Sequence, residues 1–215
     1  TTAVFEERMA ALENGRAALA VSSGMAAQTV ALLTLMEEGD ELVSASTLYG
    51  GTYSQFDVTF RKFGIHTHFV DSDDPENFRK AITPKTKALY TETIGNPLNN
   101  VLDIEAVAAI ANDAGIPLVM DSTFATPYLC RPMDFGADIV VHSATKYLDG
   151  QGRCVGGAVL GSDNMMQEVV TFLRTCGPTM SAFNAWVFLK GLETLRLRME
   201  AHSQSAIDLA HWLQA

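Results

Sequence analysis

The sequence predicts an α/β protein of three layers, in which helices cover both faces of a mostly parallel β-sheet. Short apolar segments of strand length alternate along the chain with longer segments of helical periodicity, the order expected of βαβ units. The 215 residues are 47% hydrophobic, which is enough for one sizeable core. No internal repeat or low-complexity block interrupts the alternation.

The elements expected in the first part of the chain are bounded by residues that end helices. Asn14 and Gly15 form a helix C-cap pair, and Gly39 closes the second helix. We expect helices over residues 3–13, 24–36 and 51–62, and strands over residues 17–23, 40–46 and 66–71.

The remaining strands are short apolar runs separated by two further helices. Asp103 is a suitable N-cap for the second of these helices. We expect strands over residues 87–92, 117–122, 138–144 and 156–161, helices over 75–82 and 103–114, and a loop over 123–127. From residue 162 onward the pattern is helical, and residues 183–213 predict one long helix or a kinked pair.

The composition argues against several classes of protein. The chain has 15 basic and 25 acidic residues, a formal net charge of −10, and no cluster of Lys or Arg typical of a nucleic-acid interface. Its apolar runs are far shorter than the ~18 residues of a membrane span. Three cysteines lie without CxxC or other metal-ligand spacing. We therefore expect no metal site, no nucleic-acid or membrane partner, and a reducing compartment, the cytoplasm.

Polar and small residues follow several of the predicted strands, where open parallel sheets bind ligands. The first such segment, Ser22-Ser23-Gly24-Met25, joins a strand to the start of a helix. Backbone N–H groups at a helix N-terminus form an anion site, and a glycine lets a phosphate approach them closely. The alternative is an ordinary Ser N-cap, which is a frequent use of serine.

Two titratable residues follow later strands. Asp121 ends an apolar strand, where a carboxylate is costly unless it meets a cation or several donors. It either caps a following helix or pairs with a protonated ring nitrogen of a bound cofactor. Lys146 follows Ser143 and Thr145 at the end of another strand. It is either a solvated loop lysine or an amine held ready to form an imine with an aldehyde, in which case the two hydroxyls donate to a nearby phosphate.

Six short motifs occur in order along the chain: SSGMAA, LYGGTY, ETIGNP, DSTFATP, ADIVVHSATKY and GQGRCVGG. In these motifs the chain resembles the Cys/Met-metabolism family of fold-type I pyridoxal-phosphate (PLP) enzymes, and the resemblance runs through essentially all 215 residues. The family includes cystathionine synthases and lyases, methionine γ-lyase and homoserine-ester sulfhydrylases. The resemblance implies the large domain of an aspartate aminotransferase-like fold, with PLP as the cofactor.

The resemblance also implies roles for individual residues. Lys146 would bind PLP as a Schiff base and then transfer protons between substrate carbons. Asp121 would pair with the pyridinium nitrogen, which keeps the ring an effective electron sink. Tyr49 would stack on the ring and accept a proton from the incoming amine, and Asn96 would bond the phenolic oxygen of the cofactor or the substrate carboxylate. Without the resemblance, Tyr49 and Asn96 both look like turn residues. Two further residues would support the site, Glu92 and Thr123.

The cofactor phosphate would be held at the first strand-to-helix turn and at the lysine motif. The resemblance assigns this task to the backbone of Gly24 and Met25 and to the hydroxyls of Ser143 and Thr145.

Two motifs point to the same reaction but to different acyl groups. ETIGNP resembles the O-acetylhomoserine sulfhydrylases, whereas GQGRCVGG resembles the O-succinylhomoserine sulfhydrylases. Both imply γ-replacement with sulfide on a small amino-acid substrate, which forms homocysteine in methionine biosynthesis. The alternatives are a cystathionine γ-synthase, a methionine or cystathionine γ-lyase, or a truncated PLP-binding domain without catalysis. Gly51 stands where methionine γ-lyases carry a cysteine, which counts against that lyase.

Some expectations concern the borders of the chain and its assembly. We expect residues 1–198 to form the PLP-binding large domain, and residues 199–215 to begin a helix that connects to a C-terminal domain absent from this chain. The family implies a homotetramer, a dimer of dimers, for the full-length protein. Arg153 is either a contact for a succinyl carboxylate or a salt-bridged loop residue, and Cys154 is a packed residue rather than a nucleophile.

Overall fold

The computed structural model describes all residues from Thr1 to Ala215. Its strands lie within one residue of the predicted ranges or inside them. They are β1 (Ala17–Val21), β2 (Glu41–Ala45), β3 (His66–Val70), β4 (Thr86–Glu92), β5 (Leu118–Asp121), β6 (Ile139–Ser143) and β7 (Gly157–Gly161).

These strands form one seven-stranded sheet in the order β1-β7-β6-β5-β4-β2-β3. The strands from β6 to β3 pair in parallel, whereas β7 is antiparallel to both of its neighbours. The prediction of a mostly parallel sheet is therefore confirmed. The parallel part needs crossover connections, and the helices supply them.

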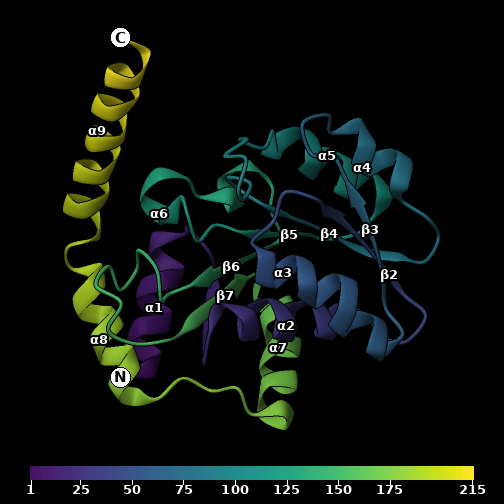
Figure 1. Ribbon diagram of the computed structural model, residues 1–215. Helices are drawn as coiled ribbons and strands as arrows, with labels where there is room; N and C mark the ends of the chain where they lie inside the picture. Colours follow the sequence, from purple (N-terminus) through teal and green to yellow (C-terminus); the bar gives the residue numbers. More distant parts are fainter.

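Helices cover both faces of the sheet, which confirms the three-layer α/β/α class (Figure 1). The helices are α1 (Thr2–Leu12), α2 (Gly24–Leu35), α3 (Gly50–Ser54), α4 (Glu76–Ala81), α5 (Ile104–Ala114), α6 (Thr126–Leu129), α7 (Asp163–Cys176), α8 (Ala182–Leu192) and α9 (Leu195–Gln214). In Figure 1, α2 and α7 lie below the sheet, α4 and α5 lie above it, and α1 and α8 lie to the left of β6 and β7. Side chains cap two of the helices as the sequence suggests: Ser23 accepts from the Ala26 N–H at 3.0 Å, and Asp103 accepts from the Ala106 N–H at 3.1 Å.

Two predicted segments differ in detail from the structure. The helix expected over 51–62 is continuous, but it passes from α3 into a π-helical turn (Gln55–Thr59) and a 3₁₀ turn (Phe60–Phe63). The loop expected over 123–127 is wrong at its end, because α6 begins at Thr126. Pro127 occupies the first turn of α6, where no helical N–H is needed, and the Thr126 hydroxyl accepts from the Tyr128 N–H at 3.3 Å.

The C-terminal helical segment is a kinked pair, since α8 ends at Leu192 and α9 begins at Leu195. The first turns of α9 bury Leu195 and Met199. The remainder of α9 is mostly exposed and projects away from the body of the molecule (Figure 1).

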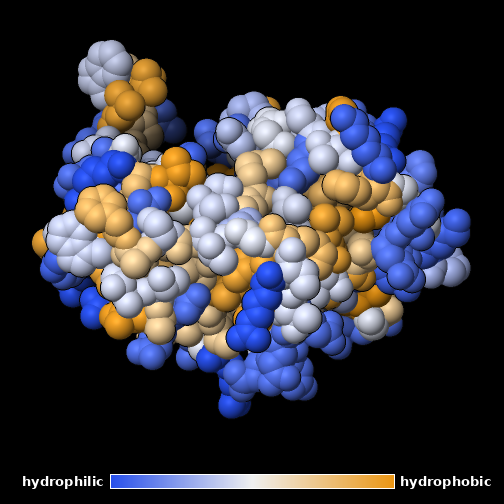
Figure 2. Space-filling view, turned by 90° about the horizontal axis from the view of Figure 1, so that it is seen from below, coloured by the Kyte–Doolittle hydropathy of each residue, from blue (hydrophilic) through white to orange (hydrophobic).

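A single core of 47 buried residues holds the layers together. The central strands supply residues buried on both faces, such as Leu89 and Tyr90 of β4 and Val140 and Val141 of β6. On the face shown in Figure 2, apolar residues lie scattered among polar and charged ones. None of the helices combines the length and the apolarity that crossing a bilayer requires.

Truncating a side chain of this core should be far more costly than truncating an exposed one of the same type. Leu89 is fully buried, whereas Leu197 is 66% exposed. We expect Leu89→Ala to lower the free energy of unfolding by about 2–5 kcal/mol and Leu197→Ala by less than about 0.5 kcal/mol. Urea unfolding followed by circular dichroism measures both. Equal losses for the two variants would contradict this assignment of the core.

Candidate functional site

Parallel pairing brings the carboxyl ends of β4, β5 and β6 to one edge of the sheet. Glu92 at the end of β4 is in register with Asp121 at the end of β5. The turn after β5 joins the end of β6, because the backbone N–H of Ser143 donates to the Thr123 hydroxyl at 2.7 Å. Thr123 in turn donates its own N–H to Asp121 Oδ1 at 2.8 Å. These bonds tie the ends of β5 and β6 together, and strand pairing places Glu92 beside them.

The start of α2 abuts this edge. A Cβ atom on Gly24 would lie 2.5 Å from Ser143 Cβ, so only glycine allows the helix to approach β6 this closely. Ser23 caps the helix, as the conservative interpretation of this segment expects. The backbone N–H groups of Gly24 and Met25 nevertheless donate to no group of the chain. Two free donors at a helix N-terminus favour an anion at this position.

Lys146 lies in the turn that follows β6, with its backbone N–H donating to the Ser143 carbonyl at 3.2 Å. Its side chain is exposed and makes no hydrogen bond or ion pair. Burial raises the pKa of Asp121, and the hydrogen bonds from Thr123, with a smaller contribution from the nearby Lys146, only partly offset this effect. An unpaired amine thus lies near a carboxyl group that burial has deprived of solvent, without forming a direct contact with it.

Tyr49 begins the turn before α3, on the other side of this edge. Its backbone N–H donates to Glu92 Oε1 at 2.7 Å, and the residue is 51% exposed. Burial, together with the neighbouring charge of Asp121, raises the pKa of Glu92 to about 8, against the lowering effect of the Tyr49 N–H. The Glu92 carboxyl group therefore fixes the Tyr49 turn to the end of β4.

The loop after β4 carries Asn96 beside the same turn. Asn96 is exposed and makes no hydrogen bond within the chain. The neighbouring Gly95 packs against Thr47, since a Cβ at Gly95 would lie 2.7 Å from the Thr47 hydroxyl. Asn96 directly follows Gly95, and Thr47 lies two residues before Tyr49. The contact between Gly95 and Thr47 therefore brings the loop that carries Asn96 to the turn that contains Tyr49.

Thr145 differs from Ser143, although the resemblance groups their hydroxyls together. The Thr145 hydroxyl lies 3.3 Å from the Gly156 carbonyl oxygen and 3.2 Å from the Gly156 nitrogen. It already ties the lysine turn to the segment before β7. The Ser143 hydroxyl makes no hydrogen bond within the chain and faces Gly24 at the start of α2.

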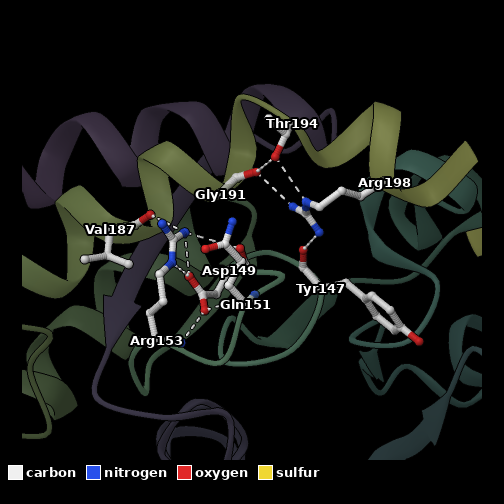
Figure 3. A network of polar contacts seen from close by, with 8 residues as sticks. All are labelled: Tyr147, Asp149, Gln151, Arg153, Val187, Gly191, Thr194 and Arg198. Atoms are coloured by element: carbon white, nitrogen blue, oxygen red, sulfur yellow. Dashed lines mark hydrogen bonds and ion pairs between the residues drawn. The ribbon is translucent and has the colours of Figure 1, made fainter. Parts of the chain in front are cut away.

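Arg153 forms an ion pair with Asp149, with Nη2 and Oδ1 separated by 2.8 Å. It also reaches the Val187 carbonyl of α8 at 3.4 Å (Figure 3). The structure therefore agrees with a salt-bridged loop arginine, whose Nη1 group makes no hydrogen bond within the chain. Cys154 is partly buried against the core, and burial raises the pKa of its thiol.

A buried network behind Tyr49 was missed in the sequence. The Gln28 side chain of α2 accepts from the Thr52 hydroxyl at 3.1 Å and from the Tyr90 hydroxyl at 3.0 Å, and it donates to Gln55. The network fixes α3, which directly follows Tyr49, against the helix whose N-terminus carries the free donors. The available signal was the position of Gln28 between Ala27 and Val30 on a mostly buried helix face, where an amide needs partners.

The residues at this edge suit an anionic, ring-shaped aldehyde cofactor such as PLP. Free helix N–H groups suit a phosphate. The buried carboxyl group of Asp121 suits a protonated ring nitrogen. The unpaired amine of Lys146 suits the aldehyde. Tyr49 supplies an exposed aromatic ring beside them.

The raised pKa of Glu92 predicts a pH dependence of stability in ligand-free protein. An ordinary Glu titrates near 4.5, so at intermediate pH the folded state holds a proton at Glu92 that the unfolded chain has released. We expect the free energy of unfolding to fall as the pH rises from about 5 to about 8. Glu92→Gln should remove part of this fall, because the amide cannot ionise but still accepts from the Tyr49 N–H. Urea unfolding at a series of pH values measures the effect.

The exposed Glu105 supplies the control, and Glu105→Gln should leave the pH dependence unchanged. An identical pH dependence in the Glu92→Gln variant and the unaltered protein would show that Glu92 does not titrate in this way.

Comparison with known proteins supports the same cofactor. Residues 1–215 match the family described as Cys/Met metabolism PLP-dependent enzyme. The chain is 49% identical to an O-succinylhomoserine sulfhydrylase of Pseudomonas aeruginosa and 46% identical to an O-acetyl-L-homoserine sulfhydrylase of Leptospira meyeri, in each case over 100% of the chain. It covers 53% and 58% of these two relatives, so the chain spans little more than half of their length.

A solved structure has the same fold. It is assigned as an O-acetylhomoserine (thiol)-lyase of Campylobacter jejuni and contains a pyridoxyl-lysine monophosphate. It matches with a TM-score of 0.94 and 33% identity, over 99% of this chain and 61% of that one. The chain belongs to the Cys/Met-metabolism family of PLP-dependent enzymes.

Proposed function

We propose that the full-length protein is a PLP-dependent sulfhydrylase, which replaces the acyloxy group of a homoserine ester with sulfide to form homocysteine. The observation that carries the proposal is the placement of an unpaired lysine amine, a buried carboxyl group and two free helix N–H groups at one edge of the sheet. The names of the two relatives support the substrate class, and they include both the acetyl and the succinyl ester.

The phosphate of the cofactor would bind at the start of α2. The N–H groups of Gly24 and Met25 have no partner within the chain, and the helix dipole adds a favourable potential for an anion. The Ser143 hydroxyl faces this position, whereas Thr145 is held by Gly156 and must exchange that partner to donate to the phosphate. We therefore expect Ser143 to contribute more to phosphate binding than Thr145.

Asp121 and Lys146 would act at opposite ends of the reactive centre. PLP, when bound, supplies an electron sink that stabilises negative charge on the substrate carbons. The Asp121 carboxylate would hold a proton on the ring nitrogen, an arrangement that offsets the cost of burying its charge. The Lys146 amine would bind the aldehyde and then move protons at the α and β carbons of the substrate. Thr123 orients Asp121 through its backbone N–H.

Tyr49 and Asn96 would bound the site on the side of the substrate. The Tyr49 ring is exposed at the edge, and its backbone is fixed by Glu92, so the ring can cover the cofactor without a change of the main chain. Asn96 has a free amide that suits an oxygen of the cofactor or of the substrate carboxylate.

The overall reaction is a substitution at the γ carbon. Hydrogen sulfide supplies the sulfur that bonds to this carbon, the C–O bond to the acyloxy group breaks, and the carboxylic acid leaves with the remaining proton. No oxidant or reductant takes part. A γ-lyase would instead release a keto acid and ammonia, and it would need no sulfide.

We also propose that the full-length protein is a homotetramer in a reducing compartment, the cytoplasm. Exposed aromatic residues such as Trp186 and Trp212 support an assembly that covers them, and three free cysteines support the compartment. Size-exclusion chromatography with light scattering measures the mass, and a monomer would contradict the first part of the proposal.

Trapping with borohydride tests the cofactor site. The full-length protein, incubated with PLP and reduced, should carry a pyridoxyl phosphate group on the peptide that contains Lys146, identified by mass spectrometry. Lys146→Ala should lose the trapped group, whereas Lys80→Ala, which alters an exposed surface lysine, should retain it. A Lys146→Ala protein that traps PLP specifically at another lysine would refute the assignment.

Product analysis tests the reaction. With sulfide and either O-acetylhomoserine or O-succinylhomoserine, the full-length protein should form homocysteine as the main product, at least about tenfold over 2-ketobutyrate, which is about 1.4 kcal/mol of preference at the branch point. Free thiol and keto acid are measured in the same sample. Keto acid as the main product in the presence of sulfide would favour a γ-lyase, and cystathionine formation from added cysteine in preference to homocysteine would favour a cystathionine γ-synthase.

A further inference from the structure

The loop that follows Lys146 is organised around the buried carboxylate of Asp149. This carboxylate accepts from the backbone N–H groups of Gln151 at 3.3 Å and Arg153 at 2.7 Å, and it is only 1% exposed. The Lys146 carbonyl accepts from the Gly150 N–H at 2.8 Å. The loop therefore closes on itself directly after the lysine.

Helix α8 packs against the backbone of this loop without an intervening side chain. A Cβ atom on Gly191 would collide with the carbonyl oxygens of Leu148 and Asp149. Glycine is therefore needed where the end of α8 meets the loop. The contact places the beginning of α9, only a few residues further along the chain, beside the lysine turn.

The guanidinium group of Arg198 in α9 bonds both the lysine turn and the break between α8 and α9 (Figure 3). Its Nη1 donates to the Tyr147 carbonyl at 2.7 Å, its Nη2 to the Gly191 carbonyl at 2.8 Å, and its Nε to the Thr194 hydroxyl at 3.1 Å. Tyr147 directly follows Lys146, so the first of these bonds holds the residue next to the amine-bearing residue. The other two bonds fix the guanidinium to the break between α8 and α9.

Arg153 makes the second link, from the loop to α8, through Asp149 and the Val187 carbonyl. In Figure 3 the two guanidinium groups lie on either side of Asp149 and Gln151. Of the two, only Arg198 bonds the backbone beside Lys146. Its neighbour Arg196 points elsewhere and pairs with the exposed Glu200 at 2.8 Å.

We propose that Arg198 is a positioning residue for Lys146: its guanidinium couples the main chain at the lysine to the start of α9. The proposal rests on the role proposed for Lys146. Three donors of one rigid fork must be aligned at once, so a shift of α9 displaces the Tyr147 carbonyl and, with it, the lysine turn. Beyond Met199 the helix α9 is mostly exposed. A group that packs against this exposed part and moves the helix would therefore also move the Lys146 amine through Arg198.

The test compares three variants of the full-length protein. Arg198→Met removes all three bonds, Arg198→Lys keeps the charge without the fork, and Arg196→Met is the matched control on the same helix. In PLP-free protein, amide hydrogen exchange of residues 146–153 should become about tenfold faster in Arg198→Met, while exchange in β4 and α2 stays unchanged. The control should match the unaltered protein.

A second readout follows the amine itself. The fraction of Lys146 trapped by PLP and borohydride is measured against PLP concentration. The half-saturation concentration should rise about tenfold in Arg198→Met and less in Arg198→Lys, as expected for the loss of a charge-assisted hydrogen bond. Partial recovery by the conservative Arg198→Lys variant, at unchanged thermal stability, separates positioning of the amine from a general loss of structure.

Folded Arg198 variants with unaltered exchange and trapping would overturn the proposal, and so would equal effects in Arg196→Met. If Arg198→Met does not fold, Arg198→Lys decides by the same two readouts. Failure of the unaltered protein to trap PLP at Lys146 would instead refute the proposed function, and the exchange experiment would still decide whether Arg198 holds the loop.

Discussion

Parallel pairing of β4, β5 and β6 brings the residues that end or follow these strands to one edge of the sheet. The hydrogen bond from the Ser143 N–H to the Thr123 hydroxyl then locks the last two strand ends together. The other elements of the candidate site are each attached to this edge. Helix α2 reaches it through Gly24, the Tyr49 turn through Glu92, and the C-terminal helices through Arg198.

Two carboxyl groups lie at this edge, and burial disfavours the ionised form of each. Asp121 and Glu92 face each other in register, and burial raises the pKa of both. Such an arrangement is costly unless a cation or a donor enters. The protonated nitrogen proposed to lie against Asp121 would supply one, and the Tyr49 N–H already supplies a donor to Glu92. The electrostatics of the chain thus favour a bound group that brings positive charge to one end of the site and negative charge to the free N–H groups of α2.

Local features of the chain were readable from the sequence, whereas contacts between distant segments were not. The strands and helices follow from apolar periodicity and from caps such as Ser23 and Asp103, whose effect extends over three residues. Lys146 and Asp121 were singled out by their positions at strand ends, and the family resemblance then assigned their roles. The Gln28 network and the Arg198 bridge join residues far apart in sequence, and their buried or half-buried polar groups look like ordinary helix residues until the helices are packed. Helix α6 was missed for a local reason, because Pro127 reads equally as a loop residue.

The central claim is that one edge of the sheet holds the whole cofactor, with its phosphate at α2, its ring nitrogen at Asp121 and its aldehyde carbon at Lys146. A crystal structure of the full-length protein after incubation with PLP and reduction tests this most directly. We predict continuous electron density from Lys146 Nζ to the pyridoxyl ring, with the phosphate against the Gly24 and Met25 N–H groups and the ring nitrogen against Asp121. Density for the phosphate away from α2, or a ring nitrogen that faces any group other than Asp121, would contradict the account.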